Sequence, residues 1–163
     1  MDFHALLNVV EHWPTDWIII GALIVLISFE ALRSGAGRAA SLSLALPLSL
    51  FLYTYLAHTT VLESLFKQAS SPLLQSVIFA ALVMSAFVLT QRITASFGGM
   101  TGSLVQSLIA GTALTIILVI VWITMPVLQT LYVFGAQVQG IFGGGYSLWW
   151  LIACYIGIAT ARS

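Results

Sequence analysis

Long runs of apolar residues, separated by short polar turns, constrain this chain more than any other feature. The chain has 163 residues, of which 60% are hydrophobic and only 6% are charged. A soluble domain carries roughly 25% charged residues, so this chain lacks the polar side chains that would cover a water-exposed surface. Disorder is excluded as well, because it needs low hydrophobicity and high charge. We therefore predict an all-α, multi-pass integral membrane protein.

A helix needs about 20 apolar residues to cross a bilayer, so the chain has room for four or five spans in one domain. The predicted spans are 17–32, 39–57, 73–90, 103–125 and 146–161, and the number falls to four if the last run does not span. Residues 1–13 are mildly amphipathic and predict a short interfacial helix. Residues 127–145 predict an interfacial or re-entrant segment.

Two local signals refine the first two spans. Pro14 ends the preceding helix, and Thr15 or Asp16 is expected to cap the next one. Pro47 lies inside the second span, where a proline is tolerated if neighbours satisfy the carbonyl group that it frees.

Basic and aromatic residues gather at opposite ends of the predicted spans. With the N-terminus outside and the C-terminus inside, four of the five basic residues face the cytoplasm, as the charge rule for membrane proteins requires. Nine of the ten Trp and Tyr residues then lie near the outer interface, which these side chains prefer, and Tyr155 is the exception. We predict this orientation in the cell membrane. The four cytoplasmic basic residues are Arg33, Arg38, Arg92 and Arg162.

Glu30 is an acidic residue within an apolar span, and such residues are functional candidates because a charge in lipid is costly. Glu30 and Arg33 are three residues apart and can pair on one helix face, and Arg38 can approach from the next helix. We favour an ion pair that holds the first helical hairpin at the inner interface. A proton relay would need a second buried acid, and Asp16 is predicted at the water-exposed outer edge.

Small residues form a stripe on the fourth span. Ser103, Ser107 and Gly111 are four residues apart, which places them on one helix face, and Gln106 can hydrogen-bond across a contact. Small-residue stripes let helices approach closely in lipid. Ordinary packing within the chain is the favoured explanation, and a self-association face or a polar pore lining are the alternatives.

No catalytic motif accompanies these features, so we expect no enzyme and no cofactor. Cys154 is the single cysteine, which excludes an internal disulfide. A metal site would have to combine His4 and His12 with a third ligand, either His58 or Glu11, and interfacial histidines are usually just solvated. The net charge is zero, without the basic cluster that nucleic acid requires. The expected partners are the lipid bilayer and either a second copy or another membrane protein.

The pattern Asp16-Trp17-Ile18-Ile19-Ile20, the turn Arg33-Ser34-Gly35-Ala36-Gly37-Arg38 and the glycine-rich turn before residue 103 resemble the colicin V production protein family. The resemblance covers about residues 14–125. It implies a small non-enzymatic bacterial inner-membrane protein with a role in envelope or secretion processes. The Arg-Ser-Gly turn and the fifth segment depart from that family's pattern. An oligomeric channel or small transporter, or an accessory subunit of a larger complex, are the alternative functions.

Overall fold

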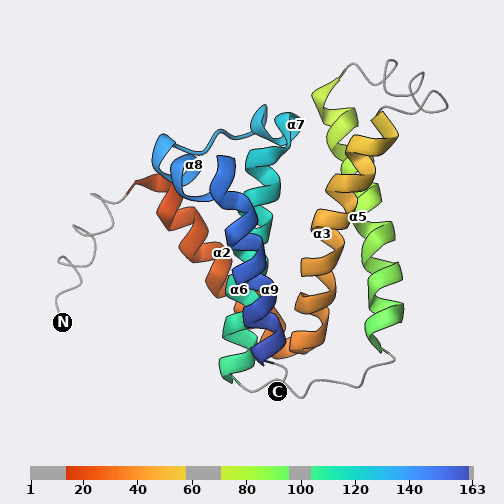
Figure 1. Ribbon diagram of the computed structural model, residues 1–163, viewed down its shortest axis with the longest axis vertical. Coiled ribbons are helices and arrows are strands. Elements are labelled where there is room, and N and C mark those ends of the chain that lie inside the picture. The colour runs from red at the N-terminus through yellow and green to blue at the C-terminus, as the bar shows by residue number, and fades with distance from the viewer. Residues whose placement is uncertain (1–13, 58–70, 96–103, 162–163) are drawn as a thin grey trace.

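The computed structural model describes residues 14–57, 71–95 and 104–161, and every regular element in those ranges is helical, which confirms the all-α prediction. The predicted interfacial helix at 1–13, the three histidines, Ser103 and Arg162 lie outside the described residues. The described residues form five long helices, with three short helical elements between the last two (Figure 1). The helices are α2 (Thr15–Ser34), α3 (Ala36–Ala57), α5 (Pro72–Ala95), α6 (Leu104–Thr124), α7 (Pro126–Gln129), α8 (Ala136–Phe142) and α9 (Ser147–Ala161), with a 3-10 turn η1 (Gly144–Tyr146).

Four of the described helices, α2, α3, α5 and α6, are long and apolar enough to cross a membrane. At 1.5 Å per residue, the 15 residues of α9 reach only about 22 Å, less than the roughly 30 Å hydrocarbon core. α8 and the η1–α9 segment together are long enough, and they are bent by 42° at the break between them. This bent pair is either a broken fifth span or a re-entrant loop, and it includes part of the region 127–145.

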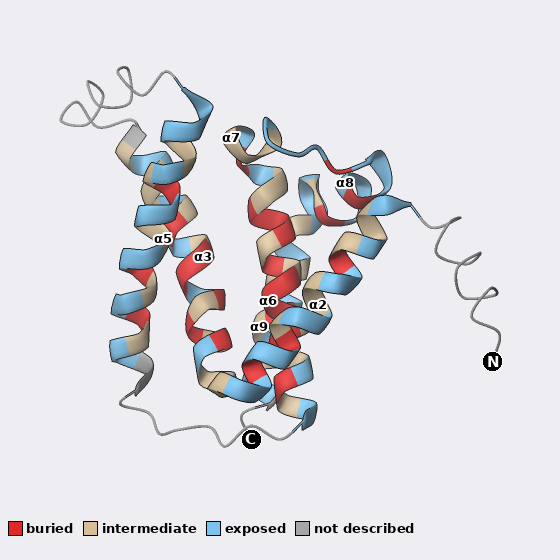
Figure 2. Cartoon of the chain, turned by 180° about the vertical axis from the view of Figure 1, so that it is seen from behind, coloured by how far each residue is buried: buried red, intermediate tan, exposed pale blue. Residues whose placement is uncertain are grey.

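α6 is the central helix of the bundle. It packs against α2, α3 and α9, and α5 packs on the other side of α3. In its apolar window 56% of α6 is buried, against 17% for α2 and for α5 (Figure 2). Its inward side chains Leu114, Ile117 and Val121 form the middle of the main hydrophobic core.

Glycine and proline fix where α2 begins and ends. Gly35 has φ 92°, a left-handed conformation that favours glycine, and this single residue turns the chain from α2 into α3. The expected side-chain cap of α2 is absent: Pro14 occupies the N-cap position, and Thr15 and Asp16 lie inside the helix. The Pro14 carbonyl accepts a hydrogen bond from the Trp17 N–H at 2.9 Å and so begins the helix.

The two ends of the bundle differ in chemistry. Arg33, at the end of α2, Arg38, at the start of α3, and Arg92, in the last turn of α5, lie at one end, here called the arginine end (Figure 1). Trp17 and Trp122 lie at the opposite end, here called the aromatic end. The polarity derived from the sequence is thus present in the described residues, and the assignment of the arginine end to the cytoplasm stays a prediction.

Candidate functional site

The small-residue stripe of α6 lies in the contact with α2. A Cβ atom added at Gly111 would lie 2.7 Å from Ser28 Cα and 2.8 Å from Ser28 N, closer than real Cβ atoms come to a neighbour. Ser107, one turn earlier, is fully buried, and Gln106 is half-buried. Backbone therefore meets backbone where α2 crosses α6, as small residues allow in lipid.

Buried serine hydroxyls are hydrogen-bonded in α3 but not in the contact between α2 and α6. Ser41, Ser43 and Ser49 each donate a hydrogen bond to a carbonyl one turn earlier in α3, at 2.7–2.9 Å. Ser28 Oγ and Ser107 Oγ are buried without a hydrogen-bond partner among the described residues. An unpaired buried hydroxyl is unfavourable, so Ser28 and Ser107 contribute to the α2–α6 contact by close packing and not through their hydroxyl groups.

Pro47 removes one hydrogen bond from the middle of α3. A proline has no N–H group, and it leaves the carbonyl four residues earlier, that of Ser43, without its helical partner. The Tyr155 hydroxyl reaches across from α9 and donates a hydrogen bond to this carbonyl at 3.0 Å. Tyr155 was the single aromatic exception to the interfacial pattern, and its position follows from this bond.

Asp16 holds the segment that connects α6 to α9 at the aromatic end. The Tyr132 hydroxyl donates to Asp16 Oδ1 at 2.6 Å, and the Gly135 N–H donates to Asp16 Oδ2 at 2.7 Å. A Cβ at Gly135 would lie 2.6 Å from the same Oδ2, so a side chain there would displace the carboxylate. The hydrogen bond to Asp16, followed by burial and the carboxylate charge, raises the pKa of Tyr132.

Two tryptophans extend this arrangement along the same segment. Trp122 Nε1 donates to the Tyr132 carbonyl and Trp150 Nε1 donates to the Ile141 carbonyl, both at 2.9 Å. Phe134 packs edge-on against Tyr132, with ring centroids 5.2 Å apart. Four polar groups of this segment, on Tyr132, Gly135 and Ile141, are thus bonded to side chains of the long helices, which suits a structural role for Asp16.

The charged residues of the first hairpin meet a cavity at the arginine end. A pocket of about 290 Å³ lies between α2, α3, α5 and α6, and Glu30, Ser34 and Arg38 are its polar lining residues. We call it the arginine-end pocket. In the described part of the chain no ion pair joins Glu30 to Arg33 or Arg38. Arg33 does not line the pocket.

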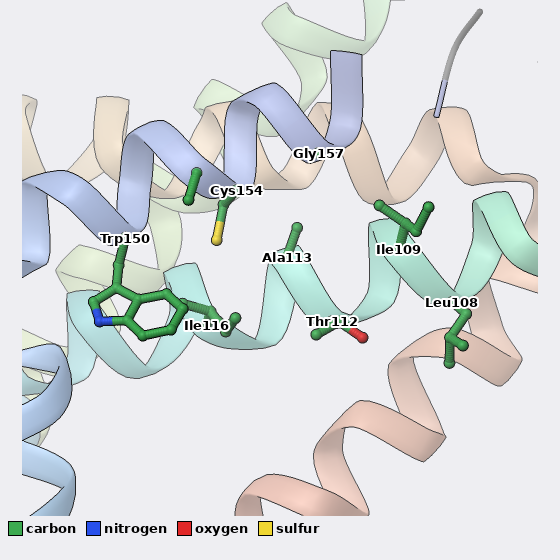
Figure 3. Close-up of a pocket in the computed structure, with 9 residues that line it drawn as sticks. Leu108, Ile109, Thr112, Ala113, Ile116, Trp150, Cys154 and Gly157 are labelled. Carbon is green, nitrogen blue, oxygen red and sulfur yellow. The ribbon is translucent and has the colours of Figure 1, made fainter. Parts of the chain in front are cut away.

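A second pocket, of about 330 Å³, lies between α6 and α9 and is almost wholly apolar. The indole of Trp150 and the side chain of Ile116 close one end, and the Cys154 sulfur points from α9 toward Ala113 of α6 (Figure 3). A pocket with this mainly apolar lining fits hydrocarbon, and Thr112 and Cys154 are its small polar residues.

Neither protein-family models nor curated proteins nor solved structures match this chain. The resemblance to colicin V production proteins therefore stays a prediction. Within the described residues, no group of three or more His, Cys, Asp or Glu side chains is placed to hold a metal ion. The site with mixed chemistry is the arginine-end pocket.

Sequence reasoning singled out Glu30 and Arg38, and the structure brings both to one cavity. It missed the bonds from Tyr132 and Gly135 to Asp16, which join residues more than 110 positions apart. No local pattern could have found them, because the hydrogen bonds depend on how the connecting segment returns over α2. The Tyr155 bond had a signal: an aromatic residue away from the interface and a proline inside a span.

Proposed function

We propose that this multi-pass membrane protein is a non-enzymatic bacterial inner-membrane protein that acts by binding a partner at its arginine-end pocket, in an envelope or secretion process. The observation that carries the proposal is the pocket itself. Glu30 and Arg38 are both exposed and line one cavity of about 290 Å³ whose other walls are mainly apolar. Ligand pockets typically combine an apolar lining with a few polar groups and begin at about 300 Å³.

Binding is better supported than a pore along α6. Ser107 and Gly111, which would line such a pore, are buried against α2, and the helices there are at backbone contact. A polar path along this stripe would require α2 and α6 to separate. The same burial removes this stripe as a surface for self-association.

Site-directed photo-crosslinking in cells tests the proposal. The photoreactive substitution Phe87→p-benzoylphenylalanine places the probe in the pocket, and Val88→p-benzoylphenylalanine places it on an exposed position of the same helix that does not line the pocket. We expect position 87 to give a discrete adduct that position 88 does not give. The adduct should decrease when Glu30→Gln or Arg38→Gln is added, because these changes remove the charges that line the cavity.

The matched control is Arg92→Gln. Arg92 is an exposed arginine at the same end of the bundle and does not line the pocket. Equal labelling from positions 87 and 88, or an adduct that responds to Arg92→Gln as strongly as to Arg38→Gln, would refute a binding site in this pocket.

A further inference from the structure

We propose that the arginine-end pocket binds a bilayer phospholipid with a zwitterionic head that carries a primary ammonium group, as ethanolamine phospholipids do. The inference rests on the proposed function and names the ligand class of the same site. The ammonium group would lie at the Glu30 carboxylate, the phosphate at the Arg38 guanidinium, and the start of an acyl chain along the apolar walls.

The Glu30 carboxylate and the Arg38 guanidinium can each contact a different group of one ligand. Glu30 lies on α2 and Arg38 on α3, on either side of the Gly35 turn, and both are exposed side chains that line the pocket. No ion pair joins them among the described residues, so neither charge is neutralised by the other. Two opposite charges that line one pocket without an ion pair between them match a head group that carries one charge of each sign. Arg suits the phosphate because its guanidinium can donate two parallel hydrogen bonds.

The position along the bundle matches the depth of a lipid head. Glu30 lies four residues before the end of α2, about 6 Å from the helix end at 1.5 Å per residue. Leu42 lies four residues beyond Arg38 along α3, and Phe87 and Leu114 line the pocket from α5 and α6. The lining therefore changes from charged to apolar from the arginine end of the bundle inward, as a phospholipid changes from its head group to its acyl chains.

The lining also distinguishes between phospholipid heads. A carboxylate accepts hydrogen bonds from the N–H groups of a primary ammonium, whereas a choline head has none and is usually held by several aromatic rings. Phe87 is the one aromatic residue among those lining this pocket. An anionic glycerol head offers no cation, so it would leave the Glu30 charge opposite another negative group.

Lipid titration of the purified full chain tests the inference. Delipidated protein in a mild non-ionic detergent is titrated with ethanolamine, choline and anionic glycerol phospholipids of identical acyl chains, and bound lipid is counted by native mass spectrometry. We expect the ethanolamine lipid to bind about tenfold more tightly than the choline lipid, a ratio equivalent to about 1.4 kcal/mol. Glu30→Gln should remove that preference, and Arg38→Gln should weaken all three lipids.

Arg92→Gln is the matched control and should leave the binding unchanged. The Glu30 and Arg38 side chains are exposed, so the variants should retain the elution volume of the parent protein, which is checked by size-exclusion chromatography. Equal affinity for the three lipids, a preference for the anionic lipid, or a preference that survives Glu30→Gln would overturn the lipid assignment. If pocket crosslinking still yields a discrete protein adduct in that case, the proposed binding function stands and only its ligand class is wrong.

Discussion

Replacing Gly111 by alanine probes the α2–α6 contact with a single added methyl group. The new Cβ would lie 2.7 and 2.8 Å from two backbone atoms of Ser28 and would also meet its hydroxyl. Backbone atoms of a helix cannot move away alone, so α2 as a whole must shift. Gly21→Ala is the matched control, because Gly21 also lies inside a long helix, α2, and a Cβ there meets nothing within 4 Å.

Two effects of opposite sign determine how much Gly111→Ala changes the free energy of unfolding. Overpacking a tight contact costs about 1–3 kcal/mol. Alanine is also preferred over glycine inside a helix, by about 1 kcal/mol in peptide measurements. Gly111→Ala should therefore lower the free energy of unfolding by up to about 2 kcal/mol, and Gly21→Ala should leave it unchanged or raise it. For a protein of this size, 1 kcal/mol corresponds to about 2–4 °C in Tm.

The assay is thermal unfolding of the full chain in mild detergent, followed by fluorescence-detected size exclusion. We expect a Tm several degrees lower for Gly111→Ala than for Gly21→Ala. Adding Ser28→Gly should not restore the loss, because two of the three close atoms belong to the Ser28 backbone. Equal Tm values for Gly111→Ala and Gly21→Ala, or full rescue by Ser28→Gly, would refute backbone contact at this crossing.

Three further predictions concern hydrogen bonds. Tyr155→Phe should cost about 0.6 kcal/mol and at most about 1.7 kcal/mol, the average and the maximum for hydrogen bonds between membrane helices. The cost should be smaller when Pro47→Ala restores an N–H to the Ser43 carbonyl, and equal costs in both backgrounds, measured by thermal unfolding, would disprove the pairing. Asp16→Asn should speed proteolysis within residues 130–135, because an amide cannot accept both bonds, and an unchanged rate would argue against this anchoring. Because the pKa of Tyr132 is raised in the folded protein, its hydrogen bond to Asp16 contributes fully to stability below pH 10.0, and this contribution is lost as the pH rises through the folded-state pKa. Tyr132→Phe should show no such loss of stability on the alkaline side. An equal alkaline loss in that variant would assign the effect to another group.

Composition and periodicity were enough for the membrane class and for four helices. The predicted spans agree with α2, α3, α5 and α6 to within a few residues at each end, apart from the end of α5, which extends to Ala95. Apolar length decides these elements, because a backbone in lipid must bond to itself. The path of the fifth segment was harder to predict from the sequence, because Gly143 and Gly144 interrupt the apolar run and the structure bends there.

The candidate site was predictable in its residues and not in its geometry. A carboxylate in an apolar span marked Glu30, and the turn marked Arg38. The favoured ion pair of Glu30 is not formed among the described residues. Sequence spacing defines only which residues can meet on one helix. It says nothing of a cavity made by four helices, in which Phe87 of α5 and Leu114 of α6 complete the walls.

The two ends of the bundle differ in how their polar groups are bonded, and this contrast supports the proposed binding site at the arginine end. At the aromatic end the Asp16 carboxylate and the Trp122 indole bond to the protein's own connecting segment. Such satisfied groups have little capacity left for a ligand, and they fix the segment in place. At the arginine end Glu30 and Arg38 line a cavity without pairing to each other. A charge near lipid is costly unless it is paired, so a ligand with both charges would stabilise this end most.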